Sequence, residues 1–199
     1  MESVVPKMLK NEKIPSETEC LALLEKHICQ PTVLAHSKVV AKVAFALAKK
    51  LLEKHPELEG EVSAQRVRAA ALLHDIAKLE KNLSGEWVPR HDHAREGAKI
   101  LRKEELREIA EIVGRHVAEP GDETPVTWED IIVFYADKRV EWDKIVSISE
   151  RFAALRKRYG HKPGALERLD KVWPFVKKVE AKIWRKIGGR PLGLEKILE

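Results

Sequence analysis

Cysteine and aromatic residues are scarce in this chain of 199 residues, which contains 2 Cys and 6% Phe, Trp and Tyr together. Cys20 and Cys29 lie nine residues apart, in a stretch that reads as helical, and this spacing fits no zinc-binding motif. We therefore expect no disulfide framework. Low cysteine usage of this kind is typical of a reducing compartment, so we expect a cytoplasmic protein.

Long hydrophobic runs are also missing. No apolar run approaches 18 residues, and the best candidate, residues 39–52, is interrupted by Lys42, Lys49 and Lys50. Residues 1–13 contain no apolar segment of the kind found in a signal peptide. We expect neither a membrane span nor a targeting segment.

Strict alternation of apolar and polar residues, the pattern of a half-buried strand, is absent as well. Apolar residues instead recur at helical spacing, as at Val39, Val43 and Leu47. With 35% charged and 44% hydrophobic residues, the composition is typical of a charge-rich helical protein with a sizeable core. The sequence predicts an all-α fold: a helical bundle over residues 1–160 and a basic helical extension, residues 161–199, packed on it.

Start and stop signals divide the chain into helices. Ser16 to Glu19 and Thr127 to Asp130 resemble capping boxes, and Ser63 can cap the helix that follows it. The predicted helices cover approximately 17–28, 32–54, 64–79, 94–101, 103–115, 127–140, 143–159 and 165–187.

Positive charge is concentrated in the last third of the chain. The net charge is +5, yet residues 138–199 contain 17 Lys and Arg against 8 Asp and Glu. Such a segment could attract a phosphate-bearing substrate or RNA. The basic residues follow helical periods without interleaved aromatic residues, so a solvated helix surface explains them equally.

The adjacent pair His74-Asp75 is the most informative feature of the sequence. Both residues belong to a helix whose apolar positions turn inward, and a buried carboxylate beside a histidine is costly unless a cation neutralises it. His36 lies on the apolar side of its own helix, and Asp137 interrupts a strongly apolar one. Imidazole and carboxylate together suit a catalytic divalent ion. For Asp137, a salt bridge with a neighbouring basic residue is the alternative.

The order His36, His74-Asp75, Asp137 in a helical chain resembles the H…HD…D signature of the HD-domain metal-dependent phosphohydrolase superfamily. The resemblance covers approximately residues 32–159 and is closest to the small HD proteins of the HDIG type. It implies that these four residues bind a divalent metal and that water activated by the metal attacks phosphorus. Mixed histidine and carboxylate ligation suits Mn, Fe, Co or Ni.

Two further histidines suggest a second ion. In HD subgroups with two metals, the aspartate of the HD pair bridges the ions, so the resemblance implies that His93 and His116 could hold a second metal with Asp75. They could instead contact the phosphate directly, or have a structural role, and His91 is close enough to substitute for His93. Some two-metal relatives that cleave cyclic dinucleotides contain a GYP motif, which is absent here.

We expect Asp75, Lys78, His93 and His116 to carry catalysis, with Lys78 and Arg139 contacting the substrate. Lys78 is one turn beyond the HD pair, within reach of a phosphate oxygen. Arg139 could bind phosphate or pair with a nearby carboxylate.

The sequence thus predicts a hydrolase that cleaves a phosphate ester or anhydride of a nucleotide or related small molecule. Trp87 and Arg90 could clamp the nucleotide, or serve as a surface anchor and a solvated charge. The alternative is a metal-containing module that binds a nucleotide or RNA without turnover. We expect no membrane partner, and the five Trp leave a homodimer interface open.

Overall fold

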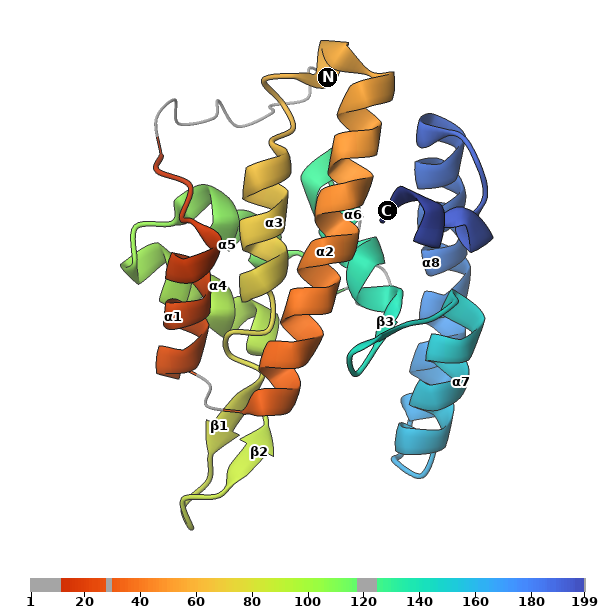
Figure 1. Cartoon of the computed structure of the whole chain (residues 1–199). Helices are drawn as coiled ribbons and strands as arrows, with labels where there is room; N and C mark the ends of the chain where they lie inside the picture. The colour runs from red at the N-terminus through yellow and green to blue at the C-terminus, as the bar shows by residue number, and fades with distance from the viewer. Residues whose placement is uncertain (1–11, 28–29, 118–124, 199) are drawn as a thin grey trace, which may run out of the picture.

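A computed structural model describes residues 12–27, 30–117 and 125–198, and helices dominate it (Figure 1). The α-helices are α1 Glu17–His27, α2 Pro31–Lys54, α3 Ala64–Leu73, α4 His93–Lys103, α5 Arg107–Gly114, α6 Trp128–Lys138, α7 Ile148–Tyr159 and α8 Ala165–Ile187. Short strands form two antiparallel hairpins, β1 Leu79–Lys81 with β2 Trp87–Pro89 and β3 Val140–Glu141 with β4 Lys144–Ile145. The predicted helical class is confirmed. Cys20 is buried and unpaired, whereas Cys29 lies outside the described residues.

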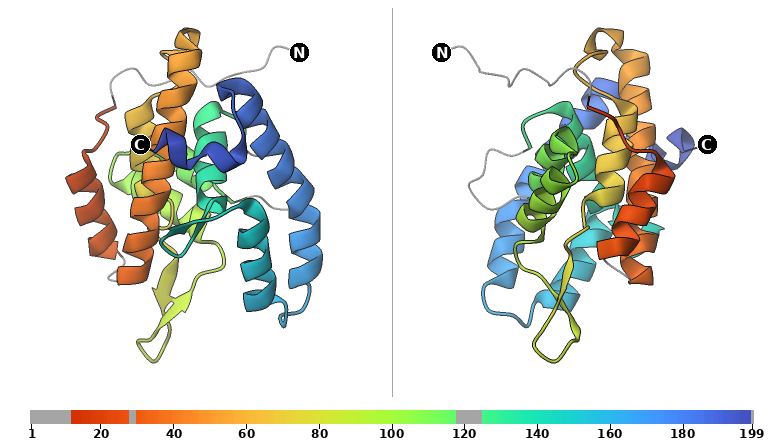
Figure 2. Two further views of the ribbon diagram at one scale, coloured as in Figure 1. Left: turned by 45° about the vertical axis from the view of Figure 1, so that its right-hand side comes forward. Right: turned by 90° about the vertical axis from the view of Figure 1, so that its left-hand side faces the viewer.

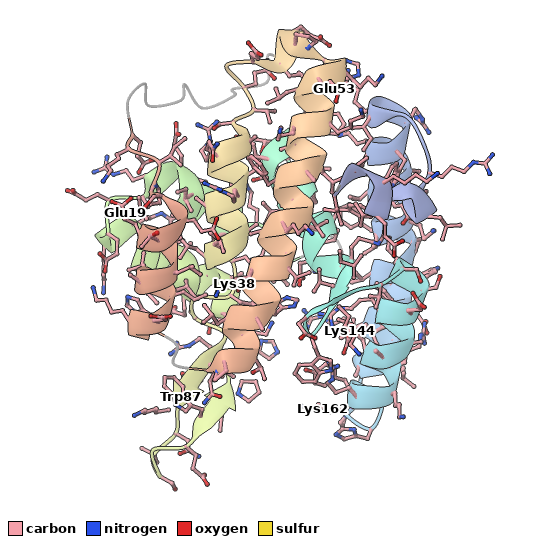
Figure 3. All side chains as sticks on the ribbon, viewed as in Figure 1. Glu19, Lys38, Glu53, Trp87, Lys144 and Lys162 are labelled. Carbon is pink, nitrogen blue, oxygen red and sulfur yellow. The ribbon has the colours of Figure 1, made fainter. Side chains whose placement is uncertain are left out.

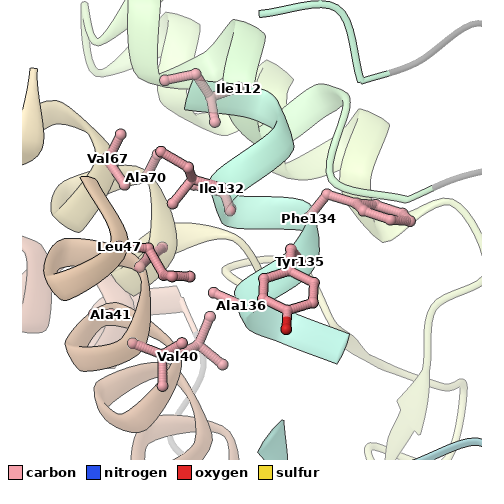
Figure 4. Packing of buried hydrophobic residues seen from close by; sticks show 14 of the residues in the cluster. Val40, Ala41, Leu47, Val67, Ala70, Ile112, Ile132, Phe134, Tyr135 and Ala136 are labelled. Carbon is pink, nitrogen blue, oxygen red and sulfur yellow. The ribbon is translucent and has the colours of Figure 1, made fainter. Parts of the chain in front are cut away.

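The core lies around α2, which packs against α3, α6 and α8. In Figure 4, Val40 and Leu47 of α2 point toward Ile132 and Ala136 of α6, and all four are at most 1% exposed. This packing explains the helical spacing of apolar residues in the sequence, because a helix presents residues three and four apart on one face. The same packing fixes the ends of α2 and α6 relative to each other, and both helices contribute to the site described below.

The sequence predicts no membrane span, although one helix, α2, has the length and composition that could cross a membrane. Among the helices of the described residues, α2 is long and apolar enough, with a mean hydropathy of 1.2 over 18 residues and few charges. Half of that window is buried inside the bundle. The position of α2 at the centre of the core therefore explains why this helix is so apolar.

Three helix starts follow the predicted capping pattern. The Glu19 amide donates to Ser16 Oγ (3.2 Å) while the Ser16 amide donates to the Glu19 carboxylate (2.7 Å). Thr127 and Asp130 form the same reciprocal pair at the start of α6, and Ser63 Oγ accepts from the backbone at the start of α3. These side chains satisfy amides that the helix itself leaves without partners.

The helix predicted over 143–159 begins later, at Ile148. The β3–β4 hairpin takes up residues 140–145, and Trp142 in its turn has a positive φ of 56°. Ser147 then starts α7 through a capping box with Glu150. The structure thus places a hairpin between α6 and α7, and this hairpin reaches back to α2.

The last two helices, α7 and α8, lie side by side along one side of the bundle in both views of Figure 2. The rings of Phe152 and Trp173 pack edge to face with centroids 4.8 Å apart. Farther along α8, Trp184 Nε1 donates to the hydroxyl of Tyr135 in α6 (2.9 Å), and this hydroxyl donates to Glu180 (3.1 Å). The C-terminal helices therefore contact the bundle, while the division at residue 160 stays a prediction.

Candidate metal centre and cavity

Four histidines and two aspartates from five separate segments meet at one place. They are His36 in α2, His74 and Asp75 after α3, His93 at the start of α4, His116 after α5, and Asp137 near the end of α6. The imidazole centroids form a continuous row in the order His36, His74, His116, His93, with successive separations of 5.4, 5.1 and 5.1 Å. The structure thus brings together all six residues for which the sequence predicted metal ligation.

The first group contains His36, His74 and Asp75, whose nearest donor atoms lie within 4.8 Å of one another. His74 Nε2 lies 3.4 Å from Asp75 Oδ2 and 3.7 Å from Asp137 Oδ1. His36 Nε2 lies 3.1 Å from the same Asp137 oxygen. Two imidazole nitrogens and two carboxylates therefore converge on one point.

The second group contains Asp75, His93 and His116, again within 4.8 Å. Asp75 uses its other oxygen here: Oδ1 lies 3.3 Å from His93 Nε2 and 3.7 Å from His116 Nε2. One carboxylate thus faces both groups, with one oxygen directed to each. This is the arrangement in which a single aspartate can bridge two ions.

Hydrogen bonds to backbone carbonyls orient three of the imidazoles. Nδ1 lies at hydrogen-bond distance from a carbonyl oxygen in each: His36 from Trp142 (2.7 Å), His74 from Ala71 (2.7 Å) and His116 from Val113 (2.6 Å). A ring that donates its Nδ1 proton in this way turns Nε2 toward the centre, as metal-binding histidines do. His74 Nε2 is buried and has no hydrogen-bond partner among the described residues. The donor set therefore fits a divalent ion.

The same hydrogen bonds explain where two helices end. The helix predicted over 64–79 stops at Leu73, and residues 74–77 form turns. The His74 ring occupies the Ala71 carbonyl, which the amide of Asp75 would use in a continuing helix. The break frees the backbone from helical geometry, so His74 and Asp75 can turn toward the same point. His116 uses the carbonyl three residues earlier in the same way, just after the end of α5.

Burial and charge oppose each other at the centre of the first group. Burial lowers the pKa of His74, but the carboxylates of Asp75 and Asp137 outweigh it and raise this pKa to about 10. Burial raises the pKa of both carboxyl groups, yet Lys78 and His74 hold that of Asp75 well below its usual range. Lys138, His36 and His74 do the same for Asp137. Two buried carboxylates therefore stay ionised and require cations around them.

In the second group, burial outweighs the nearby carboxylate, and the pKa values of its histidines are lowered. Burial, reinforced by the charge of Lys78, lowers the pKa of His93 to about 3. Burial also lowers the pKa of His116, and the charge of His74 adds to this effect. Both imidazoles are therefore neutral at pH 7, which is the state required of a metal ligand.

Three cationic side chains contact the two carboxylates. Lys78 Nζ lies 3.2 Å from Asp75 Oδ1 and Lys138 Nζ lies 2.5 Å from Asp137 Oδ2. Arg151 Nη2 is 3.9 Å from Asp137 Oδ1. Only Lys78 was predicted as a site residue. The ion pair with Lys138 is the salt bridge that the sequence offers as the alternative for Asp137, whereas Arg151 comes from α7.

A cavity of about 530 Å³ opens beside this cluster. Its lining combines the site residues Lys78, His93, His116 and Asp137 with side chains of α7, α8 and the loop between them. A volume of this size is typical of small-molecule sites. Helix α7, which the sequence placed in the bundle, and α8, which it placed in the packed extension, therefore form part of the wall around the candidate centre.

Comparison with known families matches residues 33–141 to the HD domain. This segment is more than half of the chain and contains all six clustered residues. The chain belongs to the HD-domain family. The predicted resemblance is confirmed, and His36, His74-Asp75 and Asp137 occur in the order expected of the HD-domain signature.

Several curated proteins are similar to this HD-domain chain. Two are tRNA (cytidine(56)-2′-O)-methyltransferases, from Picrophilus torridus (30% identity, 69% of this chain, 40% of the relative) and Thermoplasma volcanium (30%, 83% and 48%). A ribonuclease Y from Thermosipho melanesiensis is 36% identical over 53% of this chain and 18% of its own length. The chain thus spans less than half of either methyltransferase. No solved structure matches it.

Arg139 does not join the HD site. Its guanidinium is buried and donates to the Tyr135 hydroxyl (2.7 Å), the Val146 carbonyl (2.7 Å) and the Pro191 carbonyl (3.2 Å). These bonds tie α6 to the following hairpin and to the C-terminal segment. The donors of Arg139 point into the protein and this residue does not line the cavity, so the structure lends no support to its contact with substrate, which stays a prediction.

Trp87 and Arg90 also lie apart from the metal cluster. Both line a second cavity of about 310 Å³ beside the β1–β2 hairpin, and Arg90 pairs with Glu80 at 2.9 Å. Lys81 Nζ lies 5.4 Å from the centre of the Trp87 ring, and Figure 3 shows this tryptophan at the hairpin. The suggested nucleotide clamp is not at the HD site. Of its alternative, a surface anchor and a solvated charge, the position of Trp87 at the hairpin fits the first part, whereas Arg90 is paired with a carboxylate.

Proposed function

We propose that this HD-domain protein is a metal-dependent phosphohydrolase, which cleaves a phosphate ester or anhydride of a nucleotide or related small molecule. The observation that carries the proposal is the sharing of Asp75 between two groups of ligands, with Oδ2 toward His74 and Oδ1 toward His93 and His116. Two-metal hydrolases of phosphate compounds use clamps of this kind. The bound ion or ions, of which Mn, Fe, Co and Ni suit these ligands, would supply Lewis-acid activation of water and of the phosphate.

The protein's own cations complete the site. Lys78, Lys138 and Arg151 already surround Asp75 and Asp137, and they line the cavity together with His93, His116 and Asp137. A phosphoryl group in this position would have positive charge on several sides, which is what stabilises the charge on its oxygens during transfer. Lys78 is therefore assigned to the phosphate, as its position after the HD pair predicts.

A module that binds nucleotide or RNA without turnover is the second candidate. Its support is the basic C-terminal third and the names of the relatives, which include two tRNA methyltransferases and a ribonuclease. Nucleic-acid binding through backbone phosphates weakens steeply with salt. A salt-dependent RNA complex in which neither the RNA nor a nucleotide is hydrolysed would favour this candidate.

The experiment that separates them is hydrolysis of a panel of nucleoside mono-, di- and triphosphates, dinucleoside polyphosphates, cyclic nucleotides and short RNA, each with Mn²⁺, Co²⁺, Ni²⁺, Fe²⁺ or Mg²⁺. The products are separated by chromatography, because cleavage of a diester leaves the phosphate on a product and releases none. We expect turnover of one substrate class, lost in Asp75→Ala and retained in Asp170→Ala, a change of an exposed aspartate outside the cavity. Failure of the native protein to hydrolyse any of these compounds, with metal bound, would refute the hydrolase assignment.

A further inference from the structure

The wall formed by α7 and α8 lies beyond residues 33–141, the part of the chain that matches the HD domain. We propose that this wall is a nucleoside-binding subsite, in which a mononucleotide lies with its phosphate at the metal cluster and its base against Tyr159. The proposal rests on the proposed function for the position of the phosphate. It adds residues that determine which phosphate compounds the site accepts.

One face of α7 runs outward from the metal cluster. Arg151, Leu155 and Tyr159 all line the cavity and are spaced four residues apart, so they lie one turn after another on the same side of the helix. Eight residues of helix correspond to about 12 Å, the distance from the first to the last of these positions along the axis. One nucleotide covers such a span, whereas inorganic phosphate leaves most of it empty.

The inner end of this face suits a phosphate. Arg151 pairs with Glu141 through Nη1, and its Nη2 lies 3.9 Å from Asp137 Oδ1. Its Nε is buried without a hydrogen-bond partner among the described residues. Its side chain is only 13% exposed, which fixes the guanidinium beside the cluster. A buried guanidinium nitrogen without an acceptor at the cavity wall points to an anionic ligand, because an unsatisfied donor is costly.

The middle of the wall is apolar. Phe152 and Leu155 of α7 face the cavity together with Leu169 and Val172 of α8. Phe152 is held by its edge-to-face contact with Trp173, so this surface is already formed. Apolar walls with few polar groups are typical of sites for organic ligands, and they offer nothing to a bare phosphate ion.

The outer end combines an aromatic ring with positive charge. Tyr159 is 36% exposed, and Lys162 Nζ lies 5.3 Å from the centre of its ring. Figure 3 shows Lys162 at this end of the molecule, near the loop that connects α7 to α8. Lys162 and Arg168 both line the cavity, and their charge favours entry of an anion. A nucleobase can stack on an exposed tyrosine whatever its identity, since every base has a π face.

The test compares ligands that differ only in the base. Binding of AMP, ribose 5-phosphate and inorganic phosphate is measured by calorimetry with Mn²⁺, on the native protein, Tyr159→Leu, Tyr159→Phe and Lys157→Ala. The two esters are used as phosphonates, with a CH₂ group in place of the bridging ester oxygen, so that no turnover occurs during the measurement. Lys157 is exposed on α7 and does not line the cavity, so its replacement is the control. We expect native protein to bind AMP roughly tenfold more tightly than ribose 5-phosphate, a preference typical of one stacked base. Tyr159→Leu should abolish this preference, while Tyr159→Phe and Lys157→Ala keep it.

Equal affinity of the native protein for AMP and ribose 5-phosphate would overturn the subsite, as would a preference that survives in Tyr159→Leu. Tighter binding of a short RNA that does not respond to Tyr159→Leu would also overturn it. Phosphate release with Mn²⁺, measured in parallel, reports the proposed function separately. A Tyr159-dependent preference without phosphate release keeps the subsite and removes the hydrolase, whereas release without the preference does the reverse.

Discussion

Replacing the shared aspartate should affect more bound metal than replacing the unshared one. Asp75 directs one oxygen to His74 and the other to His93 and His116, whereas Asp137 contacts only the first group, through His36 and His74. Asp75→Ala therefore removes a ligand from both candidate ion sites, and Asp137→Ala removes a ligand from one. Both changes delete the same chemical group from a buried position, which makes them a matched pair.

The size of the effect follows from mass action. At free Mn²⁺ tenfold above both dissociation constants, each ion adds about 1.4 kcal/mol to the free energy of unfolding, so two ions add about 2.8 kcal/mol. Loss of a ligand is taken to weaken a site about 100-fold, the upper end of the effect of changing a residue that merely hydrogen-bonds a ligand. A site weakened to this degree contributes less than about 0.1 kcal/mol at the same Mn²⁺ concentration. The expected stabilisation by Mn²⁺ is then about 1.5 kcal/mol in Asp137→Ala and about 0.1 kcal/mol in Asp75→Ala.

Urea unfolding of each protein with and without Mn²⁺ measures this difference directly, and elemental analysis after desalting gives the number of ions retained. Asp170→Ala, an exposed change outside the cavity, should keep the native stabilisation. Equal stabilisation of the two site variants by Mn²⁺ would show that Asp75 does not serve two ions. Native stabilisation of only about 1.4 kcal/mol, lost in both variants, would indicate a single ion bound by both aspartates.

Two further predictions concern the framework of the site. Gly97→Val should lower the free energy of unfolding, measured in urea, by about 2 kcal/mol, because a Cβ at this position would already lie 3.2 Å from Ile76 Cγ2. Gly97→Ala should cost less, since alanine gains about 1 kcal/mol of helix propensity. An alanine variant as unstable as the valine variant would contradict this reasoning. Tyr135→Phe should cost about 2 kcal/mol, because the lost hydroxyl leaves the buried donors of Arg139 and Trp184 each without one acceptor. Thermal unfolding checks the second change, and an unaltered melting temperature would show that water or other groups replace the hydroxyl.

Much of the fold could be predicted because its signals are local. Apolar spacing located α2, and the capping residues Ser16, Ser63 and Thr127 marked three helix starts within one or two residues. The end of α3 could not be predicted in this way. It depends on the hydrogen bond between the His74 ring and the Ala71 carbonyl. The reason for this bond becomes visible only when the other residues of the site are in place.

The clustering of the site residues was predicted for the same reason that the family is recognisable. A buried carboxylate next to a histidine is rare without a cation, so His74-Asp75 indicated a metal before any contact was known. Arg139 shows the limit of this reasoning. A basic residue two positions after Asp137 is equally compatible with the cavity and with the core, and only the positions of Tyr135 and Val146 decide that it belongs to the core.

The least predictable part of the site is its C-terminal wall, and this has a physical cause. The metal cluster is selected by strong, short-range interactions that constrain residue identity, so it leaves a pattern in the sequence. A substrate wall is made of ordinary residues such as Leu155 and Tyr159, whose contribution depends on where α7 lies against the bundle. The helical spacing of the basic residues in the last third of the chain fits a solvated surface equally well, because one side of a helix on the surface of a protein faces water. Arg151 lies beside Asp137, and Tyr159 lies two turns farther along α7. One face of this helix therefore follows the cavity outward from the metal cluster. In the proposed function, the HD segment supplies the chemistry, and in the proposed subsite α7 and α8 select the compound on which it acts.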